Sequence, residues 1–121
     1  MSKRTGPTNP VLRRLIQDLK KKSIELKSPF LKEIAEKLNK PRRQRIEVNL
    51  SHIERHARDG ETVIVPGVVL GCGQLSKPVT VCAWRFSKPA MEKIKKSRGK
   101  VLTIEELLEK NPRGSNVRIL C

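Results

Sequence analysis

The spacing of the apolar residues changes near residue 61, and this change limits the folds that the chain can adopt. Before it, apolar residues recur at helical spacing, and after it short Val-rich runs bounded by Gly and Pro alternate with short helical patterns. The only aromatic residues are Phe30, Trp84 and Phe86, so the core must consist of Leu, Ile and Val. These features predict an α/β layer structure with a basic helical part over residues 1–60 and a strand-rich part over residues 61–121.

In the first part, the periodicity predicts one helix from about Pro10 to Leu26, with Leu12, Leu15, Ile16 and Leu19 on its apolar face. A second helix should begin at Ser28, an N-cap followed by proline, and stop at Pro41. The alternation of Ile46–Leu50 favours a strand. A short helix should then run from Ser51 until Gly60 closes it in the left-handed conformation.

In the second part, the runs TVIVPG, VVLGCG and PVTVCAWRF predict strands, with Val79, Val81 and Ala83 on one face of the last. Ser87 and Pro89 should open a helix that Gly99 closes. A T-x-x-E capping box, Thr103 with Glu106, should start another helix that stops at Asn111. NVRIL is predicted as a final strand.

The formal net charge of +15, with a pI near 10.4, points to a polyanionic partner. Such an excess repels itself unless a partner neutralises it, and nucleic acid is the usual partner. The excess is present in both halves, which excludes a basic tail on a neutral domain. The segment KPRRQR, from Lys40 to Arg45, has no apolar side chain, and its guanidinium groups are suited to gripping phosphate. We expect Lys93, Lys95 and Lys96 to be solvated.

Several kinds of chemical site are not supported by the residues. The glycines of VPGVVLGCGQL lack the third glycine and the following helix of a dinucleotide fingerprint, so Gly67, Gly71 and Gly73 are interpreted as structural turns and no cofactor is expected. His52 and His56 are four residues apart but have no third ligand, so neither a metal site nor a catalytic constellation is predicted.

The remaining features concern redox state and location. The cysteines are an odd set without a CxxC pair, which indicates reduced thiols rather than a disulfide frame. No apolar run approaches the roughly 20 residues of a spanning helix, and no signal peptide is recognisable. We therefore expect a soluble, cytoplasmic protein without a membrane or small-molecule partner.

The type of nucleic acid follows from what is missing. No convincing helix-turn-helix, zinc finger or zipper is present for duplex DNA, and three aromatic residues are too few for base stacking on single strands. The remaining possibility is that the protein binds a folded RNA through the phosphates and the shape of that RNA.

Five segments, in this order, carry a resemblance over essentially the whole chain: RTGPTNPVLRRLI, PRRQRIEVNLSHI, VIVPGVVLGCGQL, VTVCAWRFS and TIEELLEKNPRGSNVRIL. Their sequence and order resemble the L-eighteen-e family of ribosomal proteins from the large subunit of archaea and eukaryotes, and the length is similar to that of archaeal members. The C-terminal part is similar to bacterial ribosomal protein L-fifteen, which implies an irregular superhelix of β-β-α turns.

The resemblance implies a structural, non-enzymatic protein that binds large-subunit ribosomal RNA and neighbouring ribosomal proteins. We expect phosphate contacts at the following basic residues: Arg4, Arg13, Arg14, Lys40, Arg42, Arg43, Arg45, Arg85 and Lys88. The alternatives are a free-standing DNA-binding protein of nucleoid type and, more remotely, an RNA-processing enzyme that depends on His52 or His56.

Overall fold

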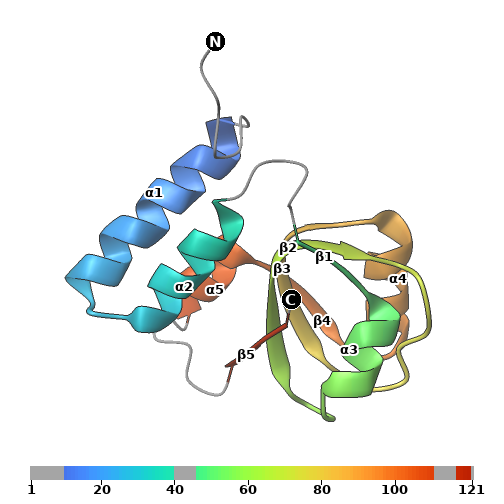
Figure 1. The fold of residues 1–121 in the computed structure, drawn as a ribbon. Helices are drawn as coiled ribbons and strands as arrows, with labels where there is room; N and C mark the ends of the chain where they lie inside the picture. Colours follow the sequence, from blue (N-terminus) through green and yellow to red (C-terminus); the bar gives the residue numbers. More distant parts are fainter. Residues whose placement is uncertain (1–9, 40–45, 111–116, 121) are drawn as a thin grey trace.

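The computed structural model describes residues 10–39, 46–110 and 117–120, which form a mixed α/β fold with a parallel sheet (Figure 1). The helices are α1 (Pro10–Glu25), α2 (Pro29–Leu38), α3 (Leu50–His56), α4 (Lys88–Lys96) and α5 (Ile104–Lys110). The strands are β1 (Ile46–Asn49), β2 (Thr62–Leu70), β3 (Thr80–Phe86), β4 (Lys100–Thr103) and β5 (Val117–Ile119). The α/β class predicted from the change in periodicity is therefore confirmed.

The sheet is parallel throughout the described strands, in the order β1-β2-β3-β4, with β5 also paired to β2. Strand β2 is long enough to take two neighbours, because Thr62–Ile64 pair with β5 and Gly67–Leu70 pair with β1. The two partners thus follow one another along the same edge. Both chain parts on either side of residue 60 contribute strands to this one sheet.

Strand β2 corrects one expectation, since TVIVPG and VVLGCG are one strand and not two. Pro66 and Gly67 lie inside it, where the register with β3 shifts between Val65 and Val68. A side chain at position 67 would collide with the carbonyl oxygen of Ile46, so glycine allows β1 to approach. The two residues that looked like a break are therefore an irregularity within a continuous strand.

Helices cover both faces of the sheet (Figure 1). One face packs on α3 and α4, and its core includes Val79, Val81 and Ala83, all fully buried as predicted. The other face packs on α1, α2 and α5, and its core includes Ile64 and Cys82 from the sheet. The four α1 residues predicted to be apolar contacts are all buried there: Leu12, Leu15, Ile16 and Leu19.

The predicted helix starts are confirmed by their hydrogen bonds. The Ser28 side chain accepts from the Leu31 N–H at 3.4 Å, and Ser87 accepts from the Ala90 N–H at 3.2 Å. In the capping box, Thr103 Oγ1 accepts from the Glu106 N–H at 3.1 Å, and Glu106 Oε1 accepts from the Thr103 N–H at 3.2 Å. Each bond satisfies an N–H that the first helical turn leaves without an intrahelical partner.

The predicted helix ends are partly wrong. Helix α3 ends at His56, and Gly60 (φ +74°) instead belongs to the following turn, where its N–H donates to the Pro78 carbonyl. The reason is that Ala57 is extended and buried, which ends the helix before Gly60. After α4, Arg98 (φ +66°) takes the left-handed conformation and not Gly99. Gly99 is needed because a side chain there would collide with the Val79 carbonyl.

Candidate nucleic-acid interface

The glycine loop after β2 directs its polar groups toward other parts of the protein. The carbonyl oxygens of Gly71 and Gly73 accept from Lys93 Nζ at 2.8 and 2.9 Å. The Ser76 N–H and hydroxyl both donate to the Glu54 carboxylate, the hydroxyl at 2.5 Å. A phosphate cradle needs free N–H groups, whereas this loop presents carbonyls to an ammonium group and already uses the Ser76 N–H on a carboxylate. The loop is a structural turn, and Gly73 has the positive φ (+97°) expected of such a turn.

Two lysines hold this region together from opposite sides. Lys93 from α4 reaches the loop carbonyls, and Lys77 Nζ donates to the carbonyls of Glu54 and Ala57 at 2.8 and 2.9 Å at the end of α3. The expectation that Lys93 is solvated is therefore wrong, because its side chain is half-buried and bonded to two carbonyls. No local pattern in the sequence indicates this role, since the bonded residues lie 20 and 22 positions away.

Glu54 is held as a carboxylate by the same contacts. The side-chain hydrogen bond from Ser76 lowers the pKa of Glu54, and the backbone bond from Ser76 and the charge of Lys77 act in the same direction, while desolvation opposes them. Glu54 is therefore a structural acceptor whose charge is used locally.

His52 and His56 form a pair on the surface of α3, and protonation of His52 is disfavoured. The ring centroids of His52 and His56 are 4.4 Å apart. Partial burial, then the neighbouring His56 and Arg55, lower the pKa of His52, so its neutral form is favoured. Among the residues that the structure describes, no group of three or more His, Cys, Asp or Glu side chains could hold a metal ion.

The cysteines in the described ranges differ in exposure. Cys72 is exposed in the glycine loop, whereas Cys82, in β3, is buried on the face that packs on α1, α2 and α5. This burial, with a smaller contribution from Glu106, raises the pKa of Cys82 to about 12. The Cys82 thiol is therefore protonated and serves as a packing group, as the sequence suggested. Cys121 lies outside the described residues.

The predicted phosphate contacts fall into two groups. Arg13 and Arg14 near the start of α1, Arg85 at the end of β3 and Lys88 at the start of α4 are all exposed. The Arg85 guanidinium lies 5.3 Å from the centre of the Trp84 ring, which restricts where its planar face points. The remaining candidates lie outside the described residues: Arg4, Lys40, Arg42, Arg43 and Arg45.

The described elements nevertheless show where the residues that adjoin these candidates in the sequence lie. Helices α1 and α2 lie side by side and run in opposite directions (Figure 1). The first residue of α1, Pro10, and the last residue of α2, Leu38, therefore lie at the same end of this helical hairpin. Arg13 and Arg14 are close to this end in the sequence of α1. The structure does not bring Arg85 and Lys88 to the hairpin, since both belong to the sheet and its helix α4.

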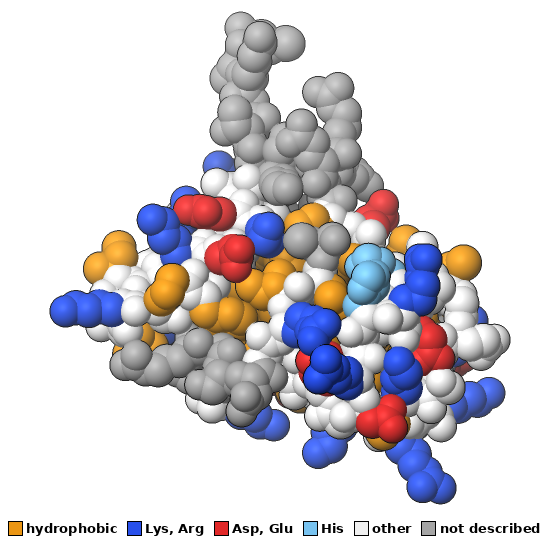
Figure 2. All heavy atoms as spheres, turned by 60° about the horizontal axis from the view of Figure 1, so that its bottom comes forward, with side chains coloured by type: hydrophobic (Ala, Val, Ile, Leu, Met, Phe, Trp, Pro, Cys, Tyr) orange, Lys and Arg blue, Asp and Glu red, His pale blue; other side chains and the backbone are white. Residues whose placement is uncertain are grey.

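Surface charge is mixed around α3. Figure 2 shows Lys and Arg side chains interspersed with Asp and Glu side chains beside the two histidines. One of these cations is engaged, because Arg118 Nε lies 3.2 Å from Glu61 Oε2 and its guanidinium donates to the His56 carbonyl at 3.0 Å. It is the one ion pair among the described residues, so most of the described cations remain free for a polyanion.

No helix of the described residues is both long and apolar enough to cross a membrane. A mixed α/β protein whose exposed cations are mostly unpaired has the charge and surface that are typical of the class of nucleic-acid-binding proteins. Comparison with known families narrows this class. The model of the family described as "Ribosomal protein 60S L18 and 50S L18e" matches residues 2–121, and the chain belongs to this family.

Known relatives match this chain over nearly the full length of both sequences. The chain is 52% identical to a protein of Methanopyrus kandleri over 121 residues, covering 96% of this chain and 95% of the relative. It is 47% identical to a protein of Methanococcus maripaludis, covering 98% of each, and 49% identical to a protein of Archaeoglobus fulgidus, covering 93% of this chain and 97% of the relative. Each is named "Large ribosomal subunit protein eL18". The resemblance suggested by the five sequence segments is thereby confirmed.

Proposed function

We propose that this chain is a structural constituent of the large ribosomal subunit, where it binds and stabilises folded ribosomal RNA in support of translation. The observation that carries this proposal is the full-length match to relatives named as large-subunit proteins. The net charge of +15 supports it, since a polyanion is needed to neutralise such an excess. On this proposal the protein works on the ribosome in the cytoplasm and is not an enzyme.

The proposed contacts with RNA are phosphate contacts at one end of the helical hairpin and at the end of β3. Arginine predominates among them because its planar guanidinium can donate two parallel hydrogen bonds to a phosphate. The set is the one expected from the sequence: Arg4, Arg13, Arg14, Lys40, Arg42, Arg43, Arg45, Arg85 and Lys88. Exposure of the four described members supports the assignment.

The two parts of the chain are proposed to divide this work. Residues 1–60 form the main RNA-binding region, and residues 61–121 form the β-β-α part that is similar to bacterial L-fifteen and packs against neighbouring ribosomal proteins. The mixed charge around α3 supports a protein neighbour on that side, because acidic side chains there would repel phosphates (Figure 2).

The experiment that tests this function is sedimentation of a native lysate in moderately high salt, with the protein detected across the gradient. Co-sedimentation with the large subunit, at close to one copy for each subunit, is the expected result. Recovery as free protein or with chromosomal DNA would contradict the proposal and favour a nucleoid-type DNA-binding protein.

A further inference from the structure

A second basic segment, KKSRGK from Lys95 to Lys100, joins α4 to β4. Like KPRRQR it has four cations in six residues and no acidic side chain. The side chains of Lys95, Lys96, Arg98 and Lys100 are all exposed. Lysines near the end of a helix are ordinarily solvated and interact favourably with the helix dipole, so exposure alone assigns them no role.

The backbone of this segment is fixed on both sides. The Ser97 hydroxyl and the Gly99 N–H donate to the Ile94 carbonyl at 2.8 and 3.0 Å, which ties the turn to the end of α4. The Lys100 N–H donates to the Val79 carbonyl at 3.2 Å, which ties it to the sheet. The four cations therefore project from a preorganised turn, and binding a ligand there would order little additional backbone.

Arg98 occupies a position that would normally be glycine. Its φ of +66° is left-handed, a conformation that disfavours any residue with a side chain and that glycine adopts freely after a helix. The packing of the turn does not require an arginine side chain, since Arg98 is exposed and has no hydrogen-bond acceptor among the described side chains. The backbone conformation at position 98 is required by the turn, since Gly99 packs against the Val79 carbonyl, whereas the exposed arginine side chain is not required by that packing.

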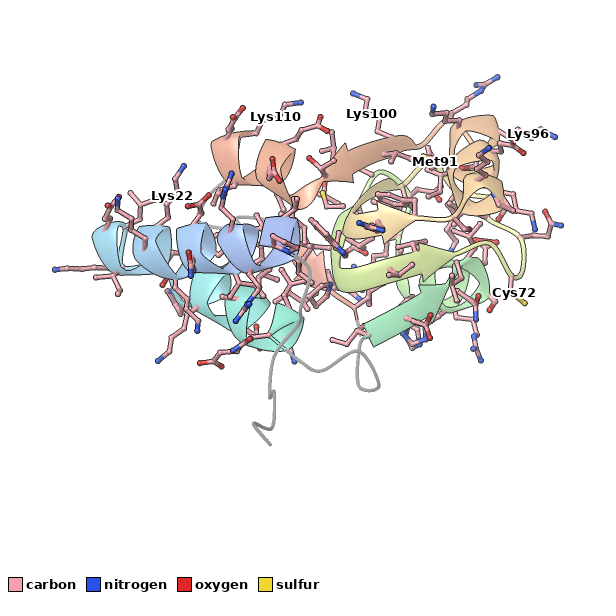
Figure 3. All side chains as sticks on the ribbon, turned by 90° about the horizontal axis from the view of Figure 1, so that it is seen from above. Lys22, Cys72, Met91, Lys96, Lys100 and Lys110 are labelled. Atoms are coloured by element: carbon pink, nitrogen blue, oxygen red, sulfur yellow. The ribbon has the colours of Figure 1, made fainter. Side chains whose placement is uncertain are left out.

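A further cation comes from a different element. Figure 3 shows Lys110, at the end of α5, and Lys100, at the start of β4, projecting on the same side of the molecule, with Lys96 of α4 farther along that side. None of these three lies within ion-pair distance of an acidic side chain in the described parts of the chain. They contrast with Lys93, one turn earlier in α4, whose ammonium group is bonded inside the protein.

We propose that these five side chains, here called the α4–β4 basic turn, form a second phosphate-binding surface for ribosomal RNA: Lys95, Lys96, Arg98, Lys100 and Lys110. The inference rests on the proposed function and adds to it a contact that is distinct from the end of the helical hairpin. RNA is the ligand because the surface offers several exposed cations, unpaired among the described residues, from a turn with a fixed backbone and from the end of α5, and a row of backbone phosphates is the partner such cations neutralise. The chain thereby contacts RNA through the sheet region as well as through its helices.

The test compares two variants with the same loss of charge. The turn variant carries Lys96→Gln, Arg98→Asn and Lys100→Gln, in which asparagine tolerates the left-handed backbone at position 98. The control variant carries Lys20→Gln, Lys21→Gln and Lys32→Gln, at exposed positions on α1 and α2 that are away from the end of the hairpin formed by Pro10 and Leu38 and are not among the nine proposed phosphate contacts. Binding of the full chain to an in vitro transcript of the Methanopyrus kandleri large-subunit ribosomal RNA is measured over a series of KCl concentrations, with duplex DNA as competitor.

The expected result is weaker binding by the turn variant, with the log–log salt dependence flattened by about 0.7 to 0.9 for each lost phosphate contact. The control variant should keep nearly the wild-type slope. Equal slopes for the two variants would overturn the basic turn while leaving the proposed function intact. Wild-type protein that prefers duplex DNA to the transcript would overturn both.

Folding is controlled separately. Thermal melting of both variants shows whether a lost helix-dipole interaction, rather than a lost RNA contact, explains weaker binding. If the turn variant does not fold, the pair Lys96→Gln with Lys110→Gln leaves the turn backbone unchanged and must still flatten the slope by more than a Lys20→Gln, Lys21→Gln pair. No excess over that pair would overturn the proposal.

Discussion

Lys93 connects helix α4 to the glycine loop, and it is the single side chain that most directly fixes the loop. Its ammonium group is bonded to the carbonyls of Gly71 and Gly73, which face the inside of the protein. Lys93→Met keeps the aliphatic length but leaves both carbonyls without their donor. Because a hydrogen bond to a charged group contributes about 1.5–3 kcal/mol, we expect the free energy of unfolding, measured with urea, to fall by about that amount.

The neighbouring Lys95 provides the control. It is exposed and lies in the same last turn of α4, so it has a comparable interaction with the helix dipole but no bond to the loop. Lys95→Met should change stability by no more than about 0.5 kcal/mol. Equal losses in the two variants would show that charge near the helix end matters and that the loop bonds do not.

At the scale of an element, helix α5 depends on its first turn because it has only seven residues. Its capping box supplies hydrogen-bond acceptors for two backbone N–H groups. Its apolar residues Ile104, Leu107 and Leu108 pack on the same face of the sheet as α1 and α2. A short helix gains little from propensity alone, so capping and packing must supply its stability. The box therefore supports one side of the core.

Removing the cap should be measurable in the whole domain. We expect Thr103→Ala to lower the free energy of unfolding by about 1 kcal/mol, because the Glu106 N–H loses its acceptor. Glu106→Gln is the matched control, since glutamine can still accept from the Thr103 N–H. The explanation fails if the conservative change at position 106 costs as much as the loss of the threonine hydroxyl.

At the scale of the whole molecule, acidic and basic residues are distributed differently along the chain. All twelve Asp and Glu residues lie in the described elements and turns, whereas the segments that adjoin the helical hairpin, residues 1–9 and 40–45, contain only cations among their charged residues. The described residues still carry 20 Lys and Arg against these 12 acidic residues, a net charge of +8, and residues 1–9 and 40–45 add six cations in 15 positions. The excess of positive charge is therefore present throughout the chain and is densest in these two segments, where like charges repel one another most strongly.

This distribution leads to a prediction for the arginine segment. Replacing Arg42, Arg43 and Arg45 with Ala should weaken binding to large-subunit ribosomal RNA and flatten its log–log salt dependence by about 0.7 to 0.9 for each lost contact. The measurement is the binding titration described for the α4–β4 basic turn. Because the two surfaces share no residues, the effects of the two sets of substitutions should add. A slope that stays at the wild-type value would remove this segment from the interface.

The sequence by itself predicted the helices and the caps at their starts, because these depend on neighbours a few positions apart, and its composition is the basis of the proposed polyanionic partner. The apolar face of α1 and the capping box at Thr103 follow from local spacing, and both were found in the structure as predicted. The family also followed from the sequence, since ordered segments carry it along the whole chain.

Only the tertiary structure decided which groups are used inside the fold and which are free. Continuity of β2 through Pro66 and Gly67 depends on β1 arriving beside it, and the role of Lys93 depends on a loop 20 residues away. The left-handed conformation of Arg98 depends on Gly99, which packs against the Val79 carbonyl just before β3. Such contacts join residues that are distant in the chain, and local periodicity carries no information about them, so the fold was needed to separate the cations that are bonded inside the protein from those that are exposed.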